Sequence, residues 1–266
     1  MPIVTLTTDW IQDDYYAGAI KGKLIASCPD INIVDISHKI PAFNTTKAAF
    51  ILKNSFHHFP KGTIHMIFVN SEPSEDAPVL AINYEGHFFI GNDNGIFGLL
   101  FRDKPAAIVE LTAPDVRNSF DSLEIFIDAA CYIANNGDIG GLGTERENYK
   151  KSIPRRATIE QDVISGSVIY IDSYQNAITN ITMELYERIG KGRPFEIALQ
   201  SNHYKLYKIN KTYCETSTGE LLVLFNSLNL LEVAINKGNA AELLNLNTDS
   251  TVRIKFFEKK SDFRNN

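Results

Sequence analysis

The chain has 266 residues, of which 44% are hydrophobic and 22% are charged, and its formal net charge is −6. These proportions are typical of a globular protein with one large domain or two, and the negative charge argues against nucleic acid as the main partner. The longest apolar runs, such as residues 221–225, are far too short to span a membrane.

The cysteines, Cys28, Cys131 and Cys214, lie far apart in the sequence. They form neither a disulfide framework nor a zinc-ligand pattern, which favours reduced thiols in a cytoplasmic protein. The first strand pattern starts at Ile3, which leaves no room for a signal peptide. We therefore expect a cytoplasmic protein with no metal site and no resident cofactor.

The first stretch is a strand followed by a helix. Residues 3–8 are predicted to form a buried strand that ends on Asp9, and Asp13 and Asp14 begin a helical pattern. Open α/β sheets bind ligands at the carboxyl ends of their strands, and a carboxylate there can accept two hydrogen bonds from a ribose diol. The alternative is that Asp9 is only a helix N-cap.

Strands and helices alternate up to about residue 140, which indicates an α/β domain with a largely parallel sheet. Further strands are expected at 32–36, 62–69, 79–82, 87–90 and 107–111, and further helices at 44–55 and 123–135.

The composition changes between residues 144 and 162, which are polar and charged without an apolar period. We interpret this segment as a solvated connection, with phosphate binding by its lysines and arginines as the alternative. Short strands expected at 166–171, 195–199, 204–209, 221–225 and 253–257 indicate a smaller, mostly β domain that is a barrel or a sandwich. The expected domains are residues 1–155 and 163–266.

Standard nucleotide and hydrolase motifs are absent: the sequence has no GxxxxGK[ST], no GxGxxG after a strand and no GxSxG. The six histidines show no metal-ligand spacing. The remaining candidates are polar residues at strand ends, each of which turn chemistry would also explain. They are Asp9, Asp14, Asn70, Asp93, Asn94, Asp172, Asn176, Asn226 and Ser227.

Seven stretches together resemble the S-adenosylmethionine hydroxide adenosyltransferases, the hydrolase relatives of the fluorinase and chlorinase enzymes. They run in the same order over nearly the whole chain: TLTTDW (5–10), NIVDISHKIP (32–41), AAFILKNSFHHFPKGTIH (48–65), GNDNGIFGLL (91–100), YIDSYQNAITNI (170–181), GELLVLFNS (219–227) and LLEVAINKGNAAELL (230–244). The resemblance implies an N-terminal α/β domain, a C-terminal β-barrel-like domain and a homotrimer. It also implies that the ligand is bound between the N-terminal domain of one subunit and the C-terminal domain of the next.

The resemblance also assigns residues to the adenosyl group. Asp9 matches the carboxylate that holds the ribose hydroxyls, and Phe43 matches an aromatic residue beside the ribose. Asn176 matches a contact to the adenine edge, Tyr213 an aromatic ring stacked on adenine, and Ala240 a backbone contact to the adenine N6 edge. The aromatic residues would also be ordinary as core residues.

A second group corresponds to the methionine end of S-adenosylmethionine, which is the expected substrate. Asp14 and Asp172 match acids near the methionine ammonium, and Ser227, with Asn226 before it, matches a contact to the methionine carboxylate. Tyr174 matches a further side-chain contact in the C-terminal domain.

The residues that orient and activate water in these hydrolases are an Asp, an Arg and a His, and all three differ here. The Asp position is Asn70, the Arg should fall within Asp-Ala-Pro at 76–78, and the His position is Asp121. Asparagine is no base, whereas Asp121 would serve if burial or Glu124 raised its pKa. Ser122 aligns with a residue that contacts halide in the fluorinase.

Two functions of different classes follow. The first is an enzyme that hydrolyses S-adenosylmethionine to adenosine and methionine, with Asn70, Asp121 and Ser122 as candidate catalytic residues; a halogenase is a variant of this hypothesis. The second is a module that binds adenosine or S-adenosylmethionine without turnover. Retention of both Asp14 and Asp172 favours the enzyme.

Overall fold

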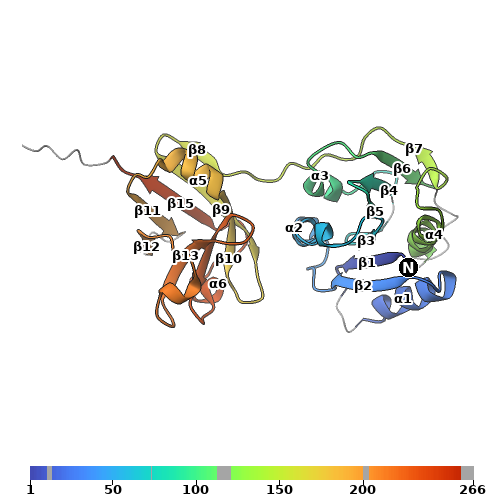
Figure 1. The fold of residues 1–266 in the computed structure, drawn as a ribbon, viewed down its shortest axis with the longest axis horizontal. Helices are drawn as coiled ribbons and strands as arrows, with labels where there is room; N and C mark the ends of the chain where they lie inside the picture. The colour runs from blue at the N-terminus through green and yellow to red at the C-terminus, as the bar shows by residue number, and fades with distance from the viewer. Residues whose placement is uncertain (11–13, 73, 113–120, 200–203, 259–266) are drawn as a thin grey trace, which may run out of the picture. The chain divides into compact units, whose positions relative to one another are not determined.

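A computed structural model describes residues 1–10, 14–72, 74–112, 121–199 and 204–258 (Figure 1). For Asp121 and Ser122 it describes the backbone only. The chain divides into two compact units, residues 1–154 and 155–266.

The first unit is a seven-stranded mixed sheet with helices on both faces. Its strand order is β2-β1-β3-β5-β4-β6-β7, with parallel pairing from β2 to β5 and antiparallel pairing beyond. The elements are β1 (Ile3–Thr8), α1 (Tyr15–Ser27), β2 (Asn32–Ser37), α2 (Thr45–Lys53), the 3₁₀ turn η1 (Phe56–His58), β3 (Ile64–Phe68), β4 (Val79–Tyr84), β5 (His87–Asn92), α3 (Ile96–Leu100), β6 (Ala107–Leu111), α4 (Asp121–Asn136) and β7 (Gly143–Glu145).

Two hydrophobic cores, one on each face, hold this sheet between its helices. Helices α1 and α4 cover one face of the sheet, and α2 and α3 cover the other (Figure 1). Leu24 of α1 and Phe126 of α4 belong to the same core as Met66, whereas Leu52 of α2 and Phe97 of α3 belong to the same core as Ile67. Successive residues of a strand point to opposite faces, so a central strand of such a sheet is apolar on both. All five residues of β3 are accordingly buried.

The second unit is an antiparallel sheet in the order β12-β11-β15-β9-β10-β14-β13, with β8 paired to β9. A bridge between Asn210, which follows β12, and Leu224 of β13 brings the two edges together and nearly closes a barrel. The elements are β8 (Thr158–Glu160), β9 (Val163–Ile171), β10 (Ala177–Thr182), α5 (Met183–Gly190), β11 (Phe195–Leu199), β12 (Lys205–Leu206), the 3₁₀ turn η2 (Tyr213–Glu215), β13 (Leu221–Phe225), β14 (Leu230–Ile235), α6 (Ala240–Leu243) and β15 (Thr251–Phe256).

The expected fold class is confirmed in both units: an α/β unit with a largely parallel sheet, and a barrel-like β unit. The strand expected at 204–209 was too long, because only the two residues of β12 form a strand there. The connection expected at 144–162 is exposed over most of its length, as a solvated connection should be, but it also contains the end of β7 and all of β8. β8 was missed because it is exposed along its whole length: only backbone hydrogen bonds to β9 define it, and an exposed strand does not need an apolar alternation in its sequence.

Over the described residues, no helix is both long and apolar enough to cross a membrane.

Candidate active site

Asp9 lies at the carboxyl end of β1, between the ends of β2 and β3. Its backbone N–H donates to the Phe68 carbonyl, which continues the pairing with β3 for one residue. Its carboxylate Oδ2 accepts hydrogen bonds from the backbone N–H of Phe43, at 2.9 Å, and of Asn70, at 3.1 Å. Within the described chain both hydrogen bonds to this carboxylate end on Oδ2, so Oδ1 keeps its lone pairs for a ligand.

The two residues held by Asp9 both have left-handed backbone conformations, with φ of 64° at Phe43 and 49° at Asn70. A non-glycine residue in this region costs on the order of 1–3 kcal/mol and persists where its surroundings fix it. The charge-assisted bonds to Asp9 supply that fixation. One carboxylate therefore sets the loops after β2 and β3, and the Phe43 side chain is left 72% exposed beside it.

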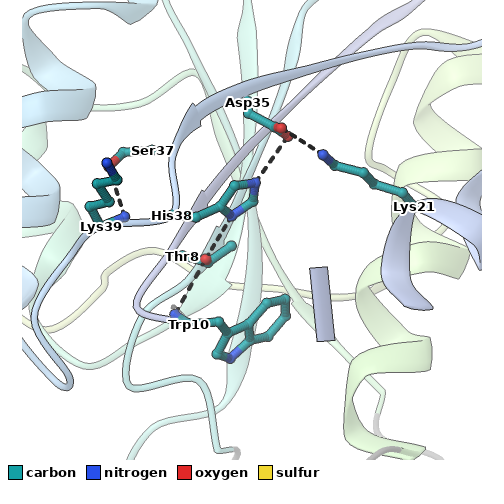
Figure 2. A network of polar contacts seen from close by, with 7 residues as sticks. All are labelled: Thr8, Trp10, Lys21, Asp35, Ser37, His38 and Lys39. Carbon is teal, nitrogen blue, oxygen red and sulfur yellow. Dashed lines mark hydrogen bonds and ion pairs between the residues drawn. The ribbon is translucent and has the colours of Figure 1, made fainter. Parts of the chain in front are cut away.

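A polar network joins the end of β1, at Thr8 next to Asp9 in the sequence, to the end of β2 (Figure 2). His38 is buried; its Nδ1 lies 2.9 Å from Thr8 Oγ1 and its Nε2 lies 3.1 Å from Asp35 Oδ1. The second contact has an ion-pair distance without hydrogen-bond alignment. Lys21 of α1 donates to Asp35 Oδ2, and the Trp10 backbone N–H donates to Thr8 Oγ1.

Opposing effects act on the pKa of Asp35. Desolvation raises it, but the hydrogen bond from Lys21 and the close contact with the His38 imidazole together outweigh that effect, so the pKa lies below its ordinary value. An ionised Asp35 thus holds His38 in place, and His38 holds the strand end that presents Asp9.

Asp14 is the N-cap residue of α1, which begins at Tyr15. The alternative role of Asp9 as the helix cap was therefore wrong. The Asp14 side chain makes no capping hydrogen bond, so its exposed carboxylate remains available beside the positive end of the helix dipole.

The Asn70 backbone is fixed from both sides. Its N–H donates to Asp9, and its carbonyl accepts a 3.0 Å hydrogen bond from Asn94 Nδ2, which also bonds to the Val69 carbonyl. Asparagine tolerates the left-handed region better than most residues. The Asn70 side chain is exposed at the site, but an amide there binds by hydrogen bonds and does not remove a proton.

The other two candidate catalytic residues, Asp121 and Ser122, begin α4, and their side chains lie outside the described structure. Glu124, which was expected to act on Asp121, forms an ion pair with Lys23 of α1. That pairing offsets the negative charge through which Glu124 would raise the pKa of a neighbouring acid.

In the second unit, Asp172 organises the loop between β9 and β10. Its Oδ1 accepts from the backbone N–H of Tyr174, at 2.9 Å, and of Asn176, at 2.8 Å, while its Oδ2 accepts from Asn176 Nδ2 at 3.1 Å. This is the turn chemistry expected as an alternative for Asp172. It also leaves the Tyr174 ring 76% exposed and fixes the amide of the buried Asn176.

Two further candidates of the second unit, Tyr213 and Asn226, are linked through Glu232 of β14. The Tyr213 hydroxyl donates to Glu232 Oε1 at 2.6 Å, and Asn226 Nδ2 donates to Oε2 at 3.1 Å. Burial, the hydrogen bond to Glu232 and the charge of Asp172 raise the pKa of Tyr213, so its hydroxyl stays protonated and Asp172 lies within electrostatic reach. Ser227 follows Asn226 in an exposed turn.

Ala240, the first residue of α6, is tied to the Asp172 loop. It is fully buried, and the N–H of Ala241 beside it donates to the Gln175 carbonyl at 2.8 Å. The structure thus forms one group of candidates around Asp9 in the first unit and another around Asp172 and Glu232 in the second.

Sequence reasoning missed two residues that support these groups, His38 and Glu232. Glu232 left a visible signal, because it is an acid in the middle of the apolar strand LLEVAI. His38 left none, since a single histidine after a strand is not distinctive. Among the described residues there is no cluster of three or more metal-binding side chains.

Comparison with known families shows the family to which the chain belongs. The model of the SAM hydroxide adenosyltransferase N-terminal domain matches residues 4–143, and that of the C-terminal domain matches residues 166–253. The chain belongs to the SAM hydroxide adenosyltransferase family. The resemblance seen in the sequence is thereby confirmed.

Individual relatives align over almost the full length. The chain is 27% identical to an (R)-S-adenosyl-L-methionine hydrolase of Methanocaldococcus jannaschii, over 92% of this chain and 93% of that protein. It is 26% identical to a hydrolase of the same name from Thermus thermophilus, over 94% and 98%. An uncharacterized conserved protein from Thermotoga maritima, of known crystal structure, shares the fold with a TM-score of 0.84 and 24% identity, over 95% and 99% of the two chains.

Proposed function

We propose that this chain is an S-adenosyl-L-methionine hydrolase that forms adenosine and L-methionine. The observation that carries the proposal is the Asp9 carboxylate, whose Oδ2 is held by two amides while Oδ1, to which none of the described residues donates, can accept from the ribose hydroxyls. Family membership and the hydrolase names of the relatives support the same activity.

In this reaction, the oxygen of a water molecule attacks C5′ of the adenosyl group. A carbon–oxygen bond forms, the C5′–sulfur bond breaks, and its electron pair neutralises the sulfonium to give the thioether of methionine. The attacking water loses a proton to solvent or to a nearby base. The sulfonium is already a good leaving group, so the protein's task is to hold water, C5′ and sulfur in line, which contributes roughly 7–11 kcal/mol in favourable cases.

The two groups of residues divide the substrate between them in this proposal. Asp9 binds the ribose and Phe43 packs beside it, while Asn176, Tyr213 and Ala240 bind adenine. The methionine end is bound by Asp14, Asp172, Tyr174, Asn226 and Ser227. The family resemblance implies a homotrimer with the ligand between neighbouring subunits, so we further propose a cytoplasmic homotrimer in which each substrate uses both groups. The free cysteines fit that compartment.

The loss of residues that activate water in the hydrolases favours a second function, binding without turnover. Asn70 stands where the hydrolases have an acid, and residues 76–78 contain no arginine. If the chain is nevertheless a hydrolase, Asp121 is the acid that remains in this set and therefore the candidate base.

The test is to incubate the protein with S-adenosylmethionine in ¹⁸O-labelled water and to analyse the products by mass spectrometry. We expect adenosine that carries the label at its 5′ oxygen, together with methionine, and we expect Asp121→Ala to slow their formation. Reactions with added chloride or fluoride test for a 5′-halogenated nucleoside.

Unchanged S-adenosylmethionine bound to the protein, with no adenosine above the protein-free control, would replace hydrolysis by the binding function. Absence of both binding and products would overturn both functions.

A further inference from the structure

Glu232 is a buried acid in the middle of the second unit's sheet. It is 2% exposed and lies in β14, paired with Ile178 of β10 on one side and Leu224 of β13 on the other. A carboxylate in such a place is costly unless its oxygens are hydrogen-bonded. Its partners therefore indicate why the chain carries an acid there.

Each oxygen of Glu232 is taken by a different side chain. Oε1 accepts the Tyr213 hydroxyl at 2.6 Å and Oε2 accepts the Asn226 amide at 3.1 Å. Tyr213 belongs to η2 and Asn226 follows β13, so one carboxylate fixes two segments that are separate in the sequence.

The bond to Asn226 also determines a backbone turn. With Nδ2 directed to Glu232, Asn226 Oδ1 accepts from the backbone N–H of Leu228, at 3.0 Å, and of Leu230, at 3.2 Å. These bonds shape the turn that presents Ser227.

We propose that Glu232 is the positioning residue of the second unit's half of the substrate site. It holds the Tyr213 ring, which stays 41% exposed for stacking, and the 226–230 turn in a binding-competent arrangement. This inference rests on the proposed function, in which Tyr213 stacks on adenine and Ser227 contacts the methionine carboxylate.

Glu232→Gln tests the role of the charge with little change of shape. The glutamine carbonyl can still accept from Asn226, while its NH₂ group donates to the Tyr213 oxygen, so the hydroxyl loses its charge-assisted bond. We expect adenosine to bind about three- to tenfold more weakly, because a charge-assisted hydrogen bond is replaced by a neutral one.

Tyr213→Phe removes the other partner and keeps the ring. If Glu232 acts through Tyr213, the double variant should bind adenosine less weakly than the product of the two single effects predicts. A buried acid needed only for stability would lower the unfolding midpoint without producing this coupling in ligand affinity.

The same unit provides a matched control pair. The hydroxyl of Tyr207, which follows β12, donates to Oε2 of Glu196 in β11 at 3.0 Å. Neither residue is a substrate-site candidate. Glu196→Gln and Tyr207→Phe should leave the adenosine affinity unchanged.

Calorimetric titration of adenosine into the parent and these variants, well below their unfolding midpoints, decides the question. Weaker binding by Glu232→Gln and non-additivity with Tyr213→Phe support the proposal. If the parent binds and Glu232→Gln binds equally well, or if the two effects are additive, the positioning role is overturned and the proposed function stands. If the parent does not bind adenosine, the positioning role is overturned, while hydrolysis is still decided by the product analysis in labelled water.

Discussion

At the scale of single residues, Asp9 shows how one carboxylate can both build a site and serve it. Its Oδ2 stabilises the left-handed backbones of Phe43 and Asn70, and its Oδ1 accepts no hydrogen bond from the part of the chain that the structure describes. The position of Asp9 was predictable, because a strand that ends on an acid is visible in the sequence. Its partners were not, since backbone N–H groups carry no side-chain signature.

Asp9→Asn should weaken adenosine binding by about ten- to a hundredfold, or about 1.4–2.8 kcal/mol. The asparagine oxygen can still accept from the two backbone N–H groups, which turns its NH₂ group toward the ligand and removes the charge. The protein should therefore stay folded while it loses affinity, as calorimetry and thermal unfolding together would show.

Two comparisons isolate the ribose contact. The parent should bind 2′-deoxyadenosine worse than adenosine, and the gap should shrink in Asp9→Asn. Asp138→Asn is the control, since Asp138 accepts a backbone N–H in an exposed turn of the same unit. Equal affinity of the parent for both nucleosides would contradict the ribose role of Asp9.

Asp35 predicts a pH dependence of stability. Its folded pKa lies below its ordinary value of 3.8, so the stabilisation is fully present above pH 3.8 and is lost as the pH falls through the lower folded value. Asp35→Asn should lower the unfolding midpoint at neutral pH, and the difference from the parent should close in strong acid. A difference that stays constant down to that range would mean that the charge of Asp35 is unimportant.

At the scale of elements, the buried strands were easier to predict than the exposed ones. β13 is an apolar run, β3 is apolar apart from one histidine, and β1 alternates branched apolar residues with threonines, so all three have the small or apolar side chains typical of a buried strand. β7 and β8 are exposed, and backbone pairing alone defines them. The acid Glu232 within the apolar strand β14 is visible in the sequence, but its role was not predictable, because its partners Tyr213 and Asn226 come from two other segments.

β3 also carries a histidine whose pKa can be tested. Burial, together with the charge of His87, lowers the pKa of His65 from 6.5 to about 3. Between these values the unfolded chain binds a proton that the folded chain does not, so the free energy of unfolding falls as the pH falls, by up to about 1.4 kcal/mol per pH unit.

His65→Gln should remove up to one proton's worth of this slope, as denaturant unfolding at a series of pH values would show. Because His65 bonds to Thr5 and His87, the variant should also be less stable at neutral pH. His58→Gln, at an exposed position in η1, is the control for replacing a histidine. An unchanged slope in His65→Gln would assign the acid sensitivity to other groups.

At the scale of the whole molecule, the candidate substrate contacts are divided between the two units of the chain. In the proposed function, the first unit supplies the carboxylate for the ribose, and the second supplies an aromatic ring and amides for adenine. Neither group contains all the contacts that the proposed substrate needs. Sequence resemblance predicted this division because its motifs are distributed over both units, whereas the local geometry came only from the structure.

The homotrimer proposal can be tested by mixing two defective variants, Asp9→Asn in the first unit and Tyr213→Ala in the second. In a shared site, the first unit comes from one subunit and the second from its neighbour. About half of the first units and about half of the neighbouring second units are then intact, so about a quarter of the sites should recover the parent affinity for adenosine. Sites formed within one chain would recover none, because every chain carries one defect. Light scattering first gives the mass of the assembly, and each variant alone gives the background; a monomeric parent, or no recovery in mixed trimers, would contradict the shared site.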